Sequence, residues 1–171
     1  PCSDVYRGES AFSEPETQAV RDFILDHDFK NVLHYHSYSN LYIHAFGDGS
    51  YPDEPDLTTH REIGNEMARY NDYFVGNCLE SINYTVNGDA SDWSYGVAGL
   101  ISFAPEVGSS AQQFWPPANE VEDLCVAGAI ANYPETDVGN NLNIYNTLFV
   151  DNYAFDDGGA IGTLSLIHIS E

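Results

Sequence analysis

The chain has few basic residues. Lys and Arg total 5 of 171, against 27 Asp and Glu, and the formal net charge is -22. Proteins that bind nucleic acids or anionic membranes depend on clustered Lys and Arg, so the composition excludes both partners. The acidic residues are spread along a chain that is 43% hydrophobic and 13% aromatic, unlike a disordered acidic tail. We therefore expect a folded, monomeric protein with one ordinary core.

Long apolar runs and a targeting sequence are also missing. No stretch approaches the about 18 consecutive apolar residues of a membrane span. Residues 1–10 lack the charged and apolar regions of a signal peptide. Cysteine is scarce, and Cys2, Cys78 and Cys125 leave an odd thiol. We expect a secreted or periplasmic protein whose natural N-terminus precedes Pro1.

The C-terminal residues have an unusual composition. Residues 164–171, LSLIHISE, resemble the translation of a sequencing adapter, so we exclude them from reasoning about the fold and expect truncation at both ends. Asn, Asp and Gly become frequent after residue 133. We therefore interpret residues 1–133 as one domain and residues 134–163 as a linker and the start of a β-rich extension, with a strand over 143–150.

Two long amphipathic helices are predicted. Ser13 and Glu16 form a capping-box pattern before a helix that runs to about residue 28, and Thr59 and Glu62 form a second one. The second helix has apolar residues at helical spacing, namely Ile63, Met67, Tyr70 and Phe74.

Short apolar segments alternate with these helices. We predict strands over 31–36, 41–46, 78–86 and 97–103, and a third helix from Asn119 to about Ile130. Helices that alternate with strands indicate an α/β fold.

Two places in this pattern carry groups capable of chemistry. His34 and His36 share one face of a strand, so both could reach one metal ion, although a histidine on a buried strand is more often a hydrogen-bonded core residue. Glu106 closes an apolar strand, where open α/β sheets bind ligands, although a solvated glutamate is the simpler interpretation.

Three sequence blocks resemble one enzyme family. HYHSYSN at 34–40, the segment from Tyr84 to Asp92-Trp93, and FAPEVG at 103–108 are similar, in order and separation, to the active-site blocks of zinc carboxypeptidases of the carboxypeptidase A type, bacterial branch. The match covers Pro1 to about Tyr133 and resembles the C-terminal half of the catalytic domain. It implies a partial mixed β-sheet flanked by helices, with the N-terminal half of the domain missing.

The resemblance implies zinc-dependent removal of the C-terminal residue of peptides or proteins. His36 would be the one matched Zn²⁺ ligand, with the other two expected upstream, and zinc would polarise the scissile carbonyl. Glu106 would be the catalytic residue that accepts the proton of the attacking water. With one of three ligands, the chain alone is expected to be inactive.

The resemblance also implies substrate-binding residues. Tyr84 would cover the terminal carboxylate of the peptide, and Ser37 and Tyr38 would line the adjoining subsite. Ser91 falls at the bottom of the side-chain pocket and decides nothing by itself. Asp89 could supply a carboxylate for a basic terminal residue, so we expect a mixed preference.

Two rival interpretations stay open. One is a noncatalytic carboxypeptidase-like module that binds peptides after losing its metal, against which the presence of Glu106 and Tyr84 argues. The other is a relative on the same sheet that acts on acylated amino acids, since fold alone does not fix the substrate.

Overall fold

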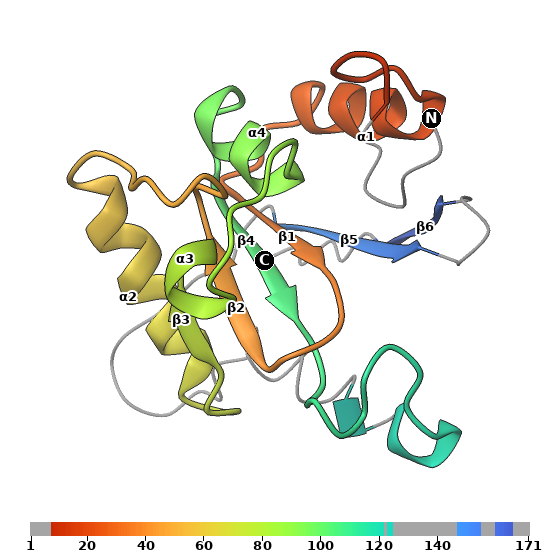
Figure 1. The fold of residues 1–171 in the computed structure, drawn as a ribbon. Coiled ribbons are helices and arrows are strands. Elements are labelled where there is room, and N and C mark those ends of the chain that lie inside the picture. Colours follow the sequence, from red (N-terminus) through yellow and green to blue (C-terminus); the bar gives the residue numbers. More distant parts are fainter. Residues whose placement is uncertain (1–7, 122, 125–146, 155–159, 166–171) are drawn as a thin grey trace, which may run out of the picture.

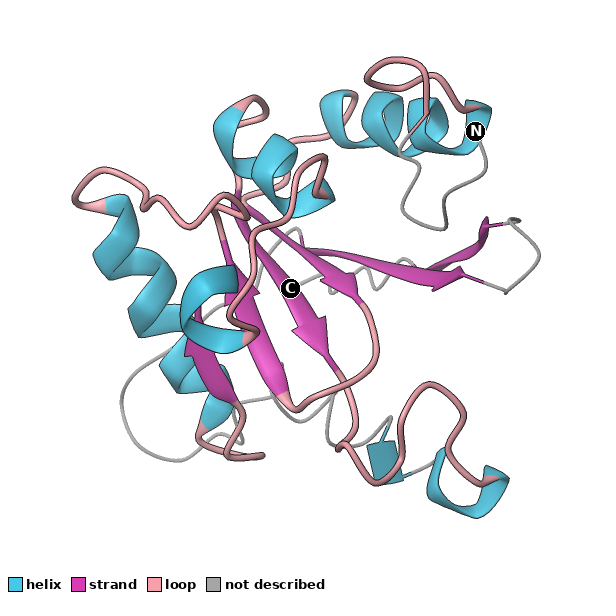
Figure 2. Cartoon of the chain, viewed as in Figure 1, coloured by secondary structure: helices cyan, strands magenta, loops and turns pink. Residues whose placement is uncertain are grey.

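The computed structural model of the protein describes residues 8–121, 123–124, 147–154 and 160–165. Figure 1 shows a sheet with helices on both sides, and Figure 2 shows the same view by secondary structure. The helices are α1 (Pro15–Leu25), α2 (Asp56–Ala68), α3 (Cys78–Ser81), α4 (Ala90–Gly96) and the 3₁₀ helix η1 (Ala118–Glu120). The strands are β1 (Asn31–Tyr35), β2 (Leu41–His44), β3 (Phe74–Gly76), β4 (Ile101–Glu106), β5 (Thr147–Ala154) and β6 (Ala160–Ser165). Within this part of the chain, no helix has the length and apolar character needed to cross a membrane.

The sheet is mixed, as expected for this fold class. Its strand order is β3-β2-β4-β1-β5-β6. β1 runs parallel to β4, whereas β2 runs antiparallel to β4 and parallel to β3. The central strands β1 and β4 are paired in the register Val32 to Ser102, so both carboxyl ends lie at the same edge of the sheet.

One face of the sheet is covered by α2. Because side chains alternate along a strand, Leu33, Tyr42 and Phe103 share this face and pack in one cluster with Met67 of α2. Gly64 lies in the middle of α2, where an added Cβ would come within 2.6 Å of Val75 Cγ1. The helix continues through Gly64, whose lack of a side chain leaves room for the strands to approach closely.

The opposite face is covered by α1, α3 and α4. Val32 packs with Ile24 of α1, and the predicted buried stripe of this helix is confirmed by Val20 and Phe23 beside it. Leu41, Ile43 and Ala104 pack with Cys78 of α3. Successive side chains of a strand point to opposite faces of the sheet. His34 and His36 are one and three residues from Leu33, and Glu106 is three residues from Phe103, so all three lie on this second face.

Both predicted capping boxes are wrong. α1 begins after Glu14, with Pro15 at its start, and the Ser13 hydroxyl donates to the Glu14 carboxylate instead. α2 begins earlier than predicted, after Pro55, so Thr59 lies in its second turn and donates to the Pro55 carbonyl. The apolar stripe of α2 also ends sooner than predicted, since Tyr70 and Phe74 are 43% and 51% exposed.

One predicted strand is wrong, and another is displaced along the sequence. Residues 78–86, predicted as a strand, form α3 and a loop, because Asn77 caps a helical turn there. The strand predicted over 97–103 is observed as β4, which begins only at Ile101 and continues to Glu106; Val97 is the C-cap of α4 instead. The strands predicted over 31–36 and 41–46 are confirmed as β1 and β2, each with a shorter C-terminal end.

Most of the predicted third helix lies outside the described residues, and its first residues form η1. The strand predicted over 143–150 is observed from Thr147 to Ala154, where it pairs with β1 in the same sheet. β6 extends two residues into the segment 164–171. The division at residue 133 and the adapter origin of 164–171 stay predictions.

Candidate active site

His36 and Glu106 lie side by side at the carboxyl edge of the two central strands. They form an isolated parallel bridge directly beyond the β1–β4 pairing. The His36 amide donates to the Pro105 carbonyl at 2.8 Å, and the Val107 amide donates to the His36 carbonyl at 2.9 Å. The backbone therefore fixes the relative positions of two residues that come from distant parts of the sequence.

The carboxyl group of Glu106 is half-buried, so the interpretation of a freely solvated glutamate is wrong. Burial, together with the negative charge of Asp89, raises the pKa of Glu106 to about 7. Both causes disfavour the charged form of this carboxyl group. A carboxyl group with a pKa near neutrality can accept a proton and return it at the same pH.

A metal site is only partly provided by this chain. The His36 side chain is exposed at the sheet edge, where a metal ion could reach its imidazole. Catalytic zinc sites usually have three protein ligands and a water molecule. Among the described residues, no group of three or more His, Cys, Asp or Glu side chains is placed to hold a metal ion. These residues alone therefore do not fit a complete zinc site, and the ligand role of His36 stays a prediction.

His34 is a core residue rather than a second ligand facing solvent. It is 1% exposed, and its Nε2 lies 2.9 Å from the Ser94 hydroxyl of α4. Burial lowers the pKa of His34 to about 4, so the imidazole is neutral. The hydrogen-bonded core alternative considered for this histidine is the one that the structure supports.

The segment after His36 is held against the end of β4. The amides of Ser39 and Asn40 both donate to the Gly108 carbonyl, at 2.7 and 3.0 Å. Tyr38 is partly buried and packs edge-on against Phe114, with ring centroids 4.9 Å apart. Ser37 is also partly buried in this segment. The structure thus places Ser37 and Tyr38 beside the bridge that brings His36 and Glu106 together.

Asp89 and Ser91 lie together at the start of α4. Asp89 caps the helix, and its Oδ1 accepts hydrogen bonds from the Ser91 amide at 2.7 Å and the Ser91 hydroxyl at 2.6 Å. Ser91 is 2% exposed, so its hydroxyl is committed to this contact. The charge of Asp89 raises the pKa values of both Glu106 and Asp92. Three carboxyl groups therefore share one acidic region.

Tyr84 lies in the loop between α3 and α4 and is 61% exposed. The described contacts do not bring its ring to Glu106, so its predicted role depends on movement of this loop.

Two residues beside the loop had no predicted role. Asn77 forms a capping box with Glu80, a pattern that the Asn-x-x-Glu spacing indicates in the sequence. Asp92 accepts hydrogen bonds from the Gly47 amide through both carboxylate oxygens.

The sequence is similar to that of proteins of known name. The family described as zinc carboxypeptidase matches residues 1–129. Human mast cell carboxypeptidase A is 32% identical over 132 residues, which are 73% of this chain and 32% of the relative. Bovine carboxypeptidase A1 is 33% identical over 128 residues, which are 71% of this chain and 30% of the relative. The chain thus spans about a third of the length of these curated relatives.

The fold is similar to solved structures of the same kind. Bovine thrombin-activatable fibrinolysis inhibitor, in complex with tick carboxypeptidase inhibitor, has a TM-score of 0.66 and 27% identity. The similarity covers 77% of this chain and 47% of that chain. Sequence and fold agree with the predicted family, and the chain belongs to the zinc carboxypeptidase family.

Proposed function

We propose that the chain is the C-terminal part of the catalytic domain of a zinc-dependent carboxypeptidase, which removes the C-terminal residue from peptides and proteins. The observation that carries this proposal is the pair of Glu106 and His36. A half-buried carboxyl group with a pKa of about 7 lies beside an accessible imidazole, at the carboxyl edge of two parallel strands. Open α/β sheets bind their ligands at this edge.

In this proposal Glu106 moves the proton. Its carboxylate oxygen accepts a proton from the attacking water and delivers it to the nitrogen of the leaving residue. The raised pKa of Glu106 suits both steps near neutral pH. His36 contributes one zinc ligand, and the other two come from sequence upstream of Pro1.

The substrate is held by residues around this pair. Tyr84 covers the terminal carboxylate and helps exclude water, which its exposed position in a loop allows. Ser37 and Tyr38 border the adjoining subsite, which their position directly after His36 supports.

We propose a mixed preference for the terminal residue, with Asp89 favouring Lys and Arg. Ser91 holds the Asp89 carboxylate in place through two hydrogen bonds. The described part of the site contains three nearby carboxyl groups, and a cationic side chain would lower the repulsion between them. Equal failure on peptides that end in Lys and in Arg would contradict this preference.

The 171-residue chain alone is proposed to be inactive and to bind zinc weakly, because it supplies one predicted ligand of three. The parent protein is proposed to be secreted or periplasmic and monomeric. Measurable release of a C-terminal residue by the pure chain would contradict its inactivity.

The test of the function uses the longest open reading frame that contains this sequence. Matched peptides that end in a free carboxylate or in a carboxamide are incubated with the purified protein, and mass spectrometry follows loss of the last residue. We expect cleavage of the free acids alone, because a carboxypeptidase reads the terminal carboxylate. Equal cleavage of both forms, or cleavage inside the peptides, would refute the proposal.

A second candidate is a noncatalytic module that binds peptides. Among the described residues, the lack of a group of three or more metal-binding side chains is compatible with both functions. If the longer protein binds peptide acids without cleaving them, and binds no zinc, this second function replaces the first.

A further inference from the structure

One short segment contacts both ends of the loop that carries Tyr84. This segment, residues 47–51, follows β2 and is here called the 47–51 clamp; residues 82–88 are called the Tyr84 segment. At the C-terminal end, the Val86 amide donates to the Gly47 carbonyl at 2.7 Å. The Gly47 amide donates in turn to Asp92 Oδ1 at 2.9 Å and Oδ2 at 3.0 Å. Gly47 therefore links the Tyr84 segment to α4.

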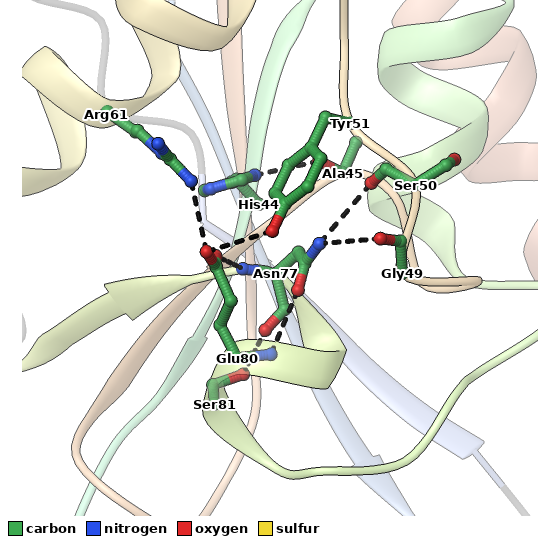
Figure 3. Close-up of polar contacts among 9 residues, drawn as sticks. All are labelled: His44, Ala45, Gly49, Ser50, Tyr51, Arg61, Asn77, Glu80 and Ser81. Atoms are coloured by element: carbon green, nitrogen blue, oxygen red, sulfur yellow. Dashed lines mark hydrogen bonds and ion pairs between the residues drawn. The ribbon is translucent and has the colours of Figure 1, made fainter.

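At the N-terminal end, Asn77 makes the corresponding link (Figure 3). Its side-chain amide donates to the carbonyls of Gly49, at 3.1 Å, and Ser50, at 3.4 Å. Its side-chain oxygen accepts from the Glu80 amide at 3.0 Å and caps α3. Asn77 is fully buried, and it joins the clamp to the helix from which the Tyr84 segment emerges.

Further contacts fix the same end. The Glu80 carboxylate accepts hydrogen bonds from the Tyr51 hydroxyl and from Arg61, both at 3.1 Å. Gly49 has a φ of +87°, and a Cβ there would collide with Leu79 of α3. The clamp thus requires glycine for its backbone conformation, and the Leu79 side chain packs directly against this position.

We infer that Asn77 and Asp92 are positioning residues that hold the two ends of the Tyr84 segment against the 47–51 clamp, so that the segment moves as an arm with two fixed ends. This inference rests on the proposed function, in which Tyr84 covers the substrate carboxylate. Fixed ends limit the positions that the ring can reach and reduce the entropy lost when it closes. Neither residue touches the substrate in this account.

Asn77 has two separable tasks, which allows a sharp test. In Asn77→Ser a hydroxyl still caps α3, since serine is a favoured cap, but no amide reaches Gly49 and Ser50. In Asn77→Ala both tasks are lost. For Asp92, Asp92→Asn keeps a side-chain oxygen that can accept from Gly47, whereas Asp92→Ala removes it.

The experiment measures amide hydrogen exchange in the 171-residue chain by mass spectrometry. We expect Asn77→Ser, Asn77→Ala and Asp92→Ala each to speed exchange within the Tyr84 segment by about five- to tenfold, the effect of one lost hydrogen bond. Amides of β1 and β4 should exchange at the wild-type rate. The control variant Asp92→Asn should exchange within the Tyr84 segment at the wild-type rate.

Any of the following results would overturn the inference. If Asn77→Ser behaves as wild type, capping is the whole role of Asn77. If exchange rises equally in β1 and β4, or if Asp92→Asn is as fast as Asp92→Ala, the two residues only support global stability. Hydrogen exchange does not depend on catalysis, so the two proposals can fail separately. If the longer protein does not cleave peptides but the exchange rates change as expected, the proposed function is refuted. The role of Asn77 and Asp92 in holding the Tyr84 segment would then remain.

Discussion

Replacing Glu106 with glutamine should change how stability depends on pH. The pKa of Glu106 is raised from an ordinary 4.5 to about 7, mainly by burial. As pH rises past 4.5, the unfolded chain releases this proton before the folded chain does, so folding stability is lost between pH 4.5 and pH 7 and is then constant. The shift corresponds to about 3 kcal/mol at about 1.4 kcal/mol per pKa unit. Because the group is half-buried, solvent screening reduces our expectation to about 2 kcal/mol.

Glu106→Gln has no proton to lose, so the assay compares the two proteins. The free energy of unfolding is measured by urea titration at intervals from pH 4 to pH 9. The variant should have nearly wild-type stability at pH 4 and should be more stable than wild type by about 2 kcal/mol above pH 7. Subtracting the two curves removes the contributions of other titrating groups, including Asp92 and His34. A difference that does not change with pH would refute the argument that Glu106 is desolvated.

Three further predictions concern the core. Ser94→Ala leaves the buried Nε2 of His34 without its partner and should lower the free energy of unfolding by about 1 to 3 kcal/mol, measured by urea titration; an unchanged value would contradict the contact. Gly64→Ala should also destabilise the protein, by about 1 to 3 kcal/mol, because the new methyl group meets Val75, and a gain from better helix propensity would contradict this packing. Cys78 is buried, which raises the pKa of its thiol to about 12, so mass spectrometry should find it alkylated by iodoacetamide only after unfolding; rapid alkylation in the native state would refute its burial.

The sequence predicts β1 and β2 well because their apolar patterns are strong. The segments that became β1 and β2 contain nearly continuous apolar residues, as strands buried on both faces do. The carboxyl group of Glu106 was predicted at the end of a strand, and β4 ends there. The approach of His36 to Glu106 depends on strand order, which no local pattern specifies. The family resemblance supplied that long-range information.

The region from 74 to 96 was harder to predict for physical reasons. β3 has three residues, too few to show a period. Cys78, Ile82 and Val86 all pack against one cluster, and their shared apolar character was interpreted as a strand. The Asn77–Glu80 capping box and the Asp89 cap were the local signals for helices, but the apolar pattern obscured them. The raised pKa of Glu106 depends on burial by the folded chain and could not be obtained from the sequence.

The most direct test of the central claim is a comparison of zinc content and turnover in the longest open reading frame that contains this sequence. Zinc per chain is measured by elemental analysis, and kcat by release of C-terminal residues. We predict about one zinc per chain in the wild type and in Glu106→Gln, with kcat lowered at least about 100-fold by this variant. His36→Ala should lose zinc. Unchanged turnover in Glu106→Gln, or full zinc retention in His36→Ala, would contradict the assignment of these two residues.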